Sequence, residues 1–322
     1  MPQEPVKFKL LDLPSVAIQH VIRRMDLKTM FFFSLASRKA KSILNYSLPR
    51  NYFHVSYSFW INKCIILNDK LVIRTNVDIS EENARPYMIQ GVLYKIFKFN
   101  NQIQINWDES FQAGMETLMT HFAESFHLPK TSYKVRYGID SEATFVFLNH
   151  AKNLTCPLME VQSLVRYLPI EVYKAFLGVG PRIIQKLHLE SRSAPDFQFR
   201  PSEVFKLDEL EIGDGRWVHL EDFMECKHVV VGNMTRDIDM YCAESKNLND
   251  FFKLWKASSC RLEFLKVEVR CTERNFEKIT AELNGTNYLR IDNAQSVEIH
   301  RVDGKKAKIR MTRMYLTLKV FD

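Results

Sequence analysis

The residues that could do chemistry are scattered along this chain of 322 residues. The nine histidines include no H-E-x-x-H pattern and no pairing with cysteine at the spacing of a zinc site. The glycine cluster Gly178-Val179-Gly180-Pro181 lacks the lysine and hydroxyl of a phosphate loop and the third glycine of a dinucleotide loop, so it predicts a turn. The sequence therefore predicts no catalytic residue, no metal ligand and no cofactor.

Carboxylates and histidines gather in one part of the second half. Eight carboxylates lie between residues 203 and 225, and none of them pairs at a fixed catalytic spacing, so we expect a solvated acidic face. These are Glu203, Asp208, Glu209, Glu211, Asp214, Glu221, Asp222 and Glu225. His188, His219 and His228 could lie near one another on stacked strands, but polar positions between core residues explain them well.

Charge and cysteine usage limit the class of protein. The net charge of +7 divides into +6 over residues 1–50, −4 over residues 51–300 and +5 over residues 301–322, which is not the profile of a dedicated nucleic-acid binder. Six cysteines with no C-x-x-C pair predict reduced thiols, hence a cytoplasmic or nuclear protein. No apolar run is long enough to cross a bilayer, and we expect no signal peptide and no membrane partner.

The elements that must position any functional residue begin with a helical unit over residues 8–46. Leu13-Pro14 predicts an extended entry, because the residue before proline avoids the helical region. Asp26 is a good N-cap for a second helix, and a basic third helix ends before Leu48-Pro49. Three short helices make a thin core, and Phe31–Phe33 cannot all face inward, so this unit is expected to need a partner.

Strands dominate from residue 51. Cys64–Leu67 and Leu71–Arg74 predict a hairpin, Ile103–Trp107 a strand, and the apolar spacing from Met115 to Phe126 a helix. A second helical stripe is expected over Val161–Leu168. Two more strands are expected at Tyr133–Tyr137 and Ala143–Leu148.

Short alternating segments recur in the last part of the chain. They begin at Leu187, Leu210, Val229, Leu265 and Val297, with helical patterns between some of them. Strands at this spacing with helices between them suggest stacked β/α units that form a curved sheet, as in leucine-rich-repeat-like proteins. The spacing is too irregular for true repeats. One of the helices contains Trp255, which we expect in the core, and Asp303-Gly304 predicts a terminal hairpin. The fold class is therefore α+β, with three N-terminal helices (8–50), a mixed region (51–182) and a β/α body (183–322).

Two stretches resemble a known family. The pattern from Phe8 to Leu35, with the basic Arg38-Lys39 after it, resembles an F-box, and more closely the large nematode-expanded branch of F-box proteins. Leu210-Glu211-Ile212, the run Asn247–Trp255, and the ending Arg301–Ala307 are similar to the F-box-associated type 2 domain. Ala40 and Ser37 depart from the tryptophan and cysteine that many F-boxes carry.

The resemblance implies a function without catalysis by this chain. F-box helices bind a Skp-type adaptor, which joins them to a cullin–RING scaffold, while the associated domain holds a protein substrate near the ubiquitin-charged enzyme. The chain is thus expected to be a substrate-recognition subunit of an SCF-type ubiquitin ligase. The residues expected to bind the adaptor are Leu10, Leu13, Pro14, Ile18, Val21, Ile22, Leu27, Met30 and Leu35. The same residues could also form the core of the three helices.

Two alternatives remain open. The first is an F-box-like interaction module that recruits no ligase. The second is nucleic-acid binding by the basic terminal hairpin, although lysine and arginine also protect edge strands from aggregation. That hairpin carries Lys305, Lys306, Lys308, Arg310 and Arg313, with Tyr315 close by.

Overall fold

The computed structural model describes most of the chain. The described residues are 10–50, 52–59, 63–75, 77, 84–99, 102–127, 129–135, 146, 149–150, 158–164, 168–194, 196–232, 245–268, 273–284, 286–291, 294–312 and 314–321. They form two compact units, Met1–Tyr133 with Asp140–Cys156, and Lys134–Ile139 with Pro157–Asp322. The three N-terminal helices therefore share unit 1 with the first strands, and a change from helices to strands near residue 50 falls inside that unit.

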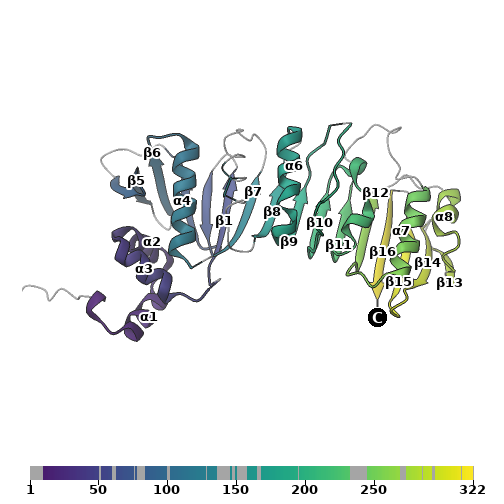
Figure 1. The fold of residues 1–322 in the computed structure, drawn as a ribbon, viewed down its shortest axis with the longest axis horizontal. Helices are drawn as coiled ribbons and strands as arrows, with labels where there is room; N and C mark the ends of the chain where they lie inside the picture. The colour runs from purple at the N-terminus through teal and green to yellow at the C-terminus, as the bar shows by residue number, and fades with distance from the viewer. Residues whose placement is uncertain are drawn as a thin grey trace, which may run out of the picture. The chain divides into compact units, whose positions relative to one another are not determined.

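Unit 1 begins with the expected helices (Figure 1). A short 3-10 turn, η1 (Leu10–Asp12), precedes α1 (Ser15–Arg24), α2 (Leu27–Ala36) and α3 (Arg38–Ser47). The strands follow in the order β7-β1-β2-β3-β6-β5-β4, with the long helix α4 (Phe111–Ser125) beside them. The strands are β1 (His54–Phe59), β2 (Cys64–Leu67), β3 (Leu71–Thr75), β4 (Arg85–Ile89), β5 (Val92–Phe99), β6 (Gln102–Trp107) and β7 (Lys130–Val135).

Several predictions for unit 1 are confirmed. The hairpin of β2 and β3 turns at Asn68 and Asp69, whose φ angles of 48° and 56° suit these two residue types. The helix expected from Met115 onward is α4, with Met115, Leu118 and Phe122 fully buried. The strand expected at Tyr133–Tyr137 is confirmed as far as Val135 by β7, which starts earlier, at Lys130; residues 136 and 137 lie outside the described residues.

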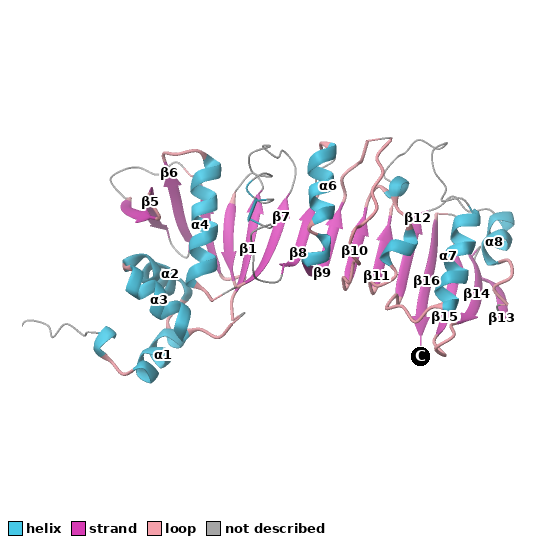
Figure 2. Cartoon of the chain, viewed as in Figure 1, coloured by secondary structure: helices cyan, strands magenta, loops and turns pink. Residues whose placement is uncertain are grey.

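Unit 2 contains the recurring strands. β8 (Leu158–Ser163), β9 (Ile183–Leu189), β10 (Glu209–Ile212), β11 (His228–Val231) and β12 (Phe264–Glu268) run parallel in that order. An antiparallel meander follows in the order β16 (Tyr315–Phe321), β15 (Lys306–Met311), β14 (Ala294–His300) and β13 (Thr286–Ile291). The helical segments are α6 (Ile170–Gly178), α7 (Ser245–Ala257), α8 (Glu273–Thr280), η3 (Gly180–Arg182), η4 (Gly215–Trp217) and η5 (Leu220–Phe223). Figure 2 shows α6, α7 and α8 on the same face of this sheet.

The α+β fold is confirmed, and so are the strands that begin near Leu187, Leu210, Val229 and Leu265. The terminal hairpin is β14 and β15, and it turns at Gly304 with a φ of 89°. The glycine cluster at 178–181 connects α6 to β9: Gly178 ends α6, and Gly180 and Pro181 begin the short 3-10 turn η3.

Two local predictions are wrong. The described part of the stripe Val161–Leu168 is not helical, because residues 161–163 belong to the strand β8; residues 165–167 lie outside the described residues. Val161 is fully buried in that strand, between its neighbours in a parallel sheet, and a helix begins only after Pro169. A short apolar run does not by itself distinguish a buried strand from a helix. Val146, the one described residue of the strand expected at Ala143–Leu148, is helical.

Alternation of side chains determines which face of the unit 2 sheet is buried. On β15 the burial pattern alternates strictly, so that Ala307, Ile309 and Met311 point inward while their neighbours are exposed. β9–β12 and β16 repeat this alternation, and their inward residues include Leu187, Leu210 and Leu316. Because consecutive side chains of a strand point to opposite faces, the helices cover one face and the other carries the polar residues.

Aromatic side chains fill the layer between helices and sheet. Trp217 is 1% exposed and has edge contacts to Tyr173, Phe197 and Phe223. Trp255 on α7 is fully buried, as expected, and its Nε1 donates a hydrogen bond to the carbonyl of Leu262 at 3.4 Å. The guanidinium of Arg301 lies 5.1 Å from the centre of the Trp255 ring.

The expected acidic face has one exception. Asp214 is 1% exposed and accepts hydrogen bonds from Ser193 and from Arg216, whose Nη2 lies 2.6 Å from Asp214 Oδ2. Burial by itself raises the pKa of Asp214, but the hydrogen bonds from Arg216 and Ser193 outweigh it and hold the pKa below its usual value. Asp214, which follows β10, is therefore part of a buried ion pair with Arg216.

Replacement of Trp255 by alanine tests the packing of α7. We expect Trp255→Ala to lower the free energy of unfolding by about 3–5 kcal/mol, because it leaves a cavity between α7 and the sheet. Leu254→Ala is the matched control on the same helix, since Leu254 is 47% exposed, and it should change stability by less than about 1 kcal/mol. Urea denaturation measures both, and an unchanged midpoint for Trp255→Ala would contradict the core position.

Removal of the Asp214 carboxylate tests the buried pair. Asp214→Ala should cost about 3–5 kcal/mol, because the guanidinium of Arg216 would stay buried without its counter-charge. Glu221→Ala is the control, since Glu221 pairs with Arg200 at the exposed surface and should cost less than about 1 kcal/mol. Urea denaturation measures the free energy of unfolding of both variants. Equal losses of this free energy would show that the buried pair at Asp214 stabilises the fold no more than the surface pair at Glu221.

Candidate adaptor-binding surface

The three N-terminal helices are defined by their caps. Pro14 precedes α1 in an extended conformation, with φ −56° and ψ 146°. Asp26 caps α2 and accepts hydrogen bonds from the backbone N–H and the hydroxyl of Thr29, which lower the pKa of Asp26. Ser37 caps α3 through the N–H of Ala40 at 3.0 Å. The start of α1 after Pro14 and the cap at Asp26 agree with the prediction from the sequence, whereas the cap at Ser37 was not predicted.

Two helices of this group are docked on α4. Phe31 of α2 stacks on Phe122 of α4, with ring centres 5.7 Å apart. Lys41 of α3 pairs with Glu124 at 2.6 Å, and the amide of Asn45 donates to the carbonyl of the same residue. The helical unit, which the sequence predicted to need a partner, thus finds part of one within its own chain.

A buried histidine completes this contact. Ser34 Oγ of α2 lies 2.9 Å from His121 Nε2 of α4, and both residues are buried. Burial lowers the pKa of His121 to about 4, and the charge of Lys41 adds to the shift. The neutral imidazole therefore belongs to the folded contact between α2 and α4.

The nine residues expected to bind the adaptor divide into two sets. Ile18, Ile22 and Met30 are buried among the three helices, at 9%, 0% and 2% exposure, so they form the core of the group. The others are accessible: Pro14 is exposed, and five are half-buried, namely Leu10, Leu13, Val21, Leu27 and Leu35. Their role in binding stays a prediction.

Val16 is an exposed residue that the sequence reasoning missed. It lies in the first turn of α1 and is 65% exposed, and the signal was present, because it is an apolar residue off the stripe that Ile18 and Ile22 define. We name the accessible apolar residues from η1 to the start of α2 the docking strip: Leu10, Leu13, Pro14, Val16, Val21 and Leu27. Leu35, near the end of α2, is not part of it. α1, which carries Val16 and Val21 of this strip, packs on α3 and lies away from α4 (Figure 1).

Ala40 and Ser37, which depart from the common F-box pattern, lie outside the docking strip. Ala40 is 2% exposed within the helical group, and Ser37 is the cap of α3. Both are thus explained by the packing and capping of α3.

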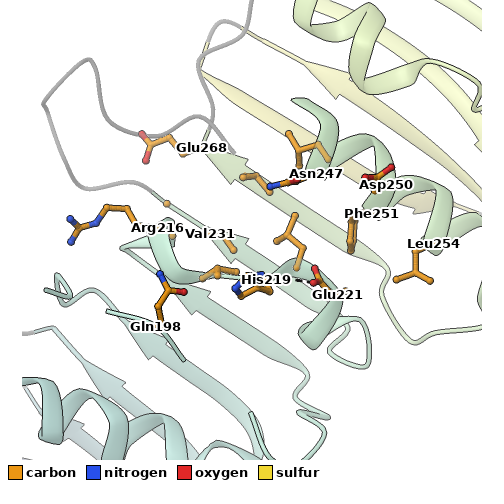
Figure 3. A pocket seen from close by; sticks show the side chains of 16 residues that line it. Gln198, Arg216, His219, Glu221, Val231, Asn247, Asp250, Phe251, Leu254 and Glu268 are labelled. Atoms are coloured by element: carbon orange, nitrogen blue, oxygen red, sulfur yellow. Dashed lines mark ion pairs between the residues drawn. The ribbon is translucent and has the colours of Figure 1, made fainter. Parts of the chain in front are cut away.

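A cavity of about 740 Å³ lies in unit 2, between η5 and α7. Figure 3 shows Phe251 and Leu254 of α7 on one side and His219 and Glu221 on the other. Val231 and Val267, near the carboxyl ends of β11 and β12, also line it. The described lining residues mix apolar side chains with acidic and basic ones, and among them no nucleophile stands beside a base.

Other candidate chemistry is likewise dispersed. His188 lies within 3.4 Å of Glu190 and Glu211, whereas His219 lies near Glu221, so the described contacts do not bring the three histidines together. Over the described residues, no group of three His, Cys, Asp or Glu side chains could hold a metal ion. Cys226 and Cys260 are buried free thiols, and the Cys226 thiol has its pKa raised to about 11 by burial. No helix in the described part of the chain is long and apolar enough to span a bilayer.

The N-terminal part is thus a group of three capped helices with an accessible apolar surface, and a body of strands and helices follows it in the chain. Comparison with protein families identifies the helical group: residues 10–51 match the F-box domain, and residues 200–267 match the F-box-associated domain. The resemblance to F-box proteins is thus confirmed at both places, and the chain carries an F-box followed by an F-box-associated domain. Comparisons with curated proteins and with solved structures give no match. An F-box implies binding of a Skp-type adaptor.

The low pKa of His121 predicts a loss of stability in acid. The pKa is about 4 in the folded chain and about 6.5 in the unfolded one, so protons bind the unfolded state first as the pH falls below 6.5. His121 should therefore cost about 2 kcal/mol of stability between pH 7.5 and pH 5. In urea denaturation, His121→Gln should remove that part of the pH dependence. His20→Gln, at an exposed residue of α1, should leave it intact. The same pH dependence in all three proteins would contradict the assignment.

Proposed function

We propose that this protein is the substrate-recognition subunit of an SCF-type ubiquitin ligase. The docking strip binds a Skp-type adaptor, which joins the chain to a cullin–RING scaffold. The observation that carries the proposal is the arrangement of the F-box helices: α2 and α3 are held on α4, while apolar side chains of η1 and α1 remain accessible. Accessible apolar side chains on a helical module are typical of protein–protein interfaces.

Rigid attachment of the F-box supports this role. A receptor raises the rate of ubiquitin transfer by holding its substrate near the charged enzyme, so the F-box must not rotate freely on the chain that follows it. The stacking of Phe31 on Phe122 and the ion pair of Lys41 with Glu124 hold α2 and α3 on α4. In this proposal the chain supplies proximity and no catalytic group of its own.

The remaining parts of the proposal follow from the same role. Unit 2, which contains the match to the F-box-associated domain, binds the protein substrate. We place the protein in the cytoplasm or the nucleus, where ubiquitin ligases of this class act and where free thiols such as Cys226 stay reduced.

The alternative is an interaction module that does not recruit a ligase. The departures at Ala40 and Ser37 are the sequence features that raised it. Because both residues serve packing and capping within the helical group, they argue less against adaptor binding than the bare sequence does.

Co-purification with the adaptor tests the proposal. The full chain, co-expressed with a Skp-type adaptor, should elute with it in size-exclusion chromatography. Leu13→Asp with Pro14→Ala should weaken the complex by about 30-fold or more, because a charge would enter an apolar interface. Val16→Glu should weaken it in the same direction.

Val204→Asp is the matched control, since Val204 is an exposed apolar residue of unit 2 with 57% exposure. It should leave adaptor binding unchanged. A wild-type chain that elutes alone beside the adaptor would refute the proposal. Retention of the adaptor by the folded double variant would refute the role of the docking strip.

A further inference from the structure

The helix-free face of the unit 2 sheet carries a cluster of cations. They come from three adjacent strands, β12, β16 and β15, and their side chains alternate with the buried residues beneath the helices. Four of the five are exposed and Lys266 is half-buried. We name this cluster the basic face: Lys266, Lys306, Lys308, Arg310 and Lys319.

The strand register places like charges opposite each other. Lys308 of β15 is the direct cross-strand partner of Lys319 of β16, and Arg310 lies in the same row as Lys266, with Thr317 between them. Like charges directly opposite each other destabilise a sheet. On the neighbouring strand β14, Glu298 is the cross-strand partner of Lys308. The carboxylate of Glu298, however, contacts His300, whose Nε2 lies 3.3 Å away.

Other basic residues of unit 2 form ion pairs with carboxylates of the same chain. Lys186 pairs with Glu209, Lys227 and Arg261 pair with Asp208, and Lys253 pairs with Glu282. Over the described residues, by contrast, no ion pair involves any member of the basic face. Lys266 only lies over the ring of Tyr315, at 4.1 Å. The basic face thus concentrates positive charge that forms no ion pair with the described residues.

Protection of a sheet edge does not explain this cluster. Lysines blunt edge strands against aggregation, and that was the simpler explanation of the basic hairpin. β15, however, pairs with β14 on one side and β16 on the other, and β16 pairs in turn with β12. All three strands are interior, so their cations have no edge to protect.

Apolar side chains adjoin the basic face. Phe264 is the cross-strand neighbour of Lys319, and Val230 is that of Lys266. Both apolar side chains are half-buried on the open face, as is Tyr315. A partner that fits this surface combines negative charge with at least one apolar side chain.

We propose that the basic face binds an extended, carboxylate-rich segment of a partner protein. On β15, Lys306, Lys308 and Arg310 recur at every second residue, about 7 Å apart. An extended segment lying along β15 presents its own side chains at the same spacing, so alternate Asp or Glu residues would each meet a cation. An apolar residue of the segment would contact Phe264 or Val230.

The distribution of charge favours such a segment over a nucleic acid. The same face turns acidic on β8 and β10, where Glu160, Glu209 and Glu211 lie. β10 is only two strands from β12, or about 10 Å. A long polyanion would meet these carboxylates, whereas a short segment along β15 and β16 would not.

This inference deepens the proposed function, in which the bound segment belongs to the protein substrate. It rests on the proposed function only for that identification. Binding to the basic face can be measured without the adaptor. Adaptor binding, in turn, depends on the docking strip in unit 1. The two proposals can therefore fail separately.

Fluorescence anisotropy with the full chain tests the inference. The probe is a fluorescein-labelled peptide of twelve residues with glutamate at every second position and one phenylalanine. We expect it to bind, and to bind more weakly as salt is added. The same peptide with glutamine in place of glutamate should bind at least about tenfold more weakly.

Charge reversal on the basic face supplies the decisive comparison. Lys308→Glu with Arg310→Glu should weaken binding of the glutamate peptide by about tenfold or more. Lys174→Glu with Lys278→Glu changes the net charge equally, at exposed positions of α6 and α8 on the helix-covered face, and should leave binding within about twofold.

A single variant separates binding from folding. Lys319→Glu replaces the like-charge pair with Lys308 by an opposite-charge pair, so it should raise the melting temperature by roughly 1–4 °C. It should nevertheless weaken peptide binding. Opposite changes in stability and in binding would show that these cations serve a ligand rather than the fold.

Three results would overturn the inference. The first is an equal loss of peptide binding in the two double variants. The second is equal affinity for the glutamate and glutamine peptides. The third is that the peptide does not bind, whereas a single-stranded RNA of twenty nucleotides binds tightly and loses binding when Lys308 and Arg310 are reversed. In each case, unchanged adaptor co-purification would leave the proposed function standing.

Discussion

The rest of unit 2 depends on the strict alternation of side chains along strands that are held in one register. Leu187, Leu210, Val229 and Leu265 are direct neighbours across β9 to β12, so their side chains form one continuous apolar row. A shift of one strand by a single residue would place charged side chains in the core and apolar ones in solvent. The same constraint that builds the core therefore also assembles the charged rows of the opposite face.

In unit 1 the comparable constraint is the contact between the F-box helices and α4. A group of three short helices buries little apolar surface by itself. Phe31 and Ser34 extend that core onto Phe122 and His121 of α4. The packing holds α2 and α3 in one orientation and leaves η1 and α1 accessible. The packing of α2 and α3 on α4 thus both stabilises the helical group and keeps the docking strip accessible.

Several elements could be predicted because their signals are local. These signals act within a few residues of chain: the cap at Asp26, the hairpin turn at Asn68-Asp69 and the hairpin turn at Gly304. The error at Val161–Leu168 shows the limit, since the run forms a strand only because β9 pairs with it. Asp214 is a second case. Its carboxylate is buried against Ser193 and Arg216, and the spacing of carboxylates in the sequence does not predict these hydrogen bonds.

The sequence by itself determined the three capped helices, the alternating strands, the absence of a recognisable catalytic motif and the resemblance to F-box proteins, because each depends on residues close together in the chain. The tertiary structure alone decided which apolar F-box residues stay accessible, since burial of Ile18, Ile22 and Met30 depends on how three helices pack. It also decided that Lys308 faces Lys319 and that β15 is an interior strand. Register and strand order arise from pairing between distant segments, and no local pattern records them.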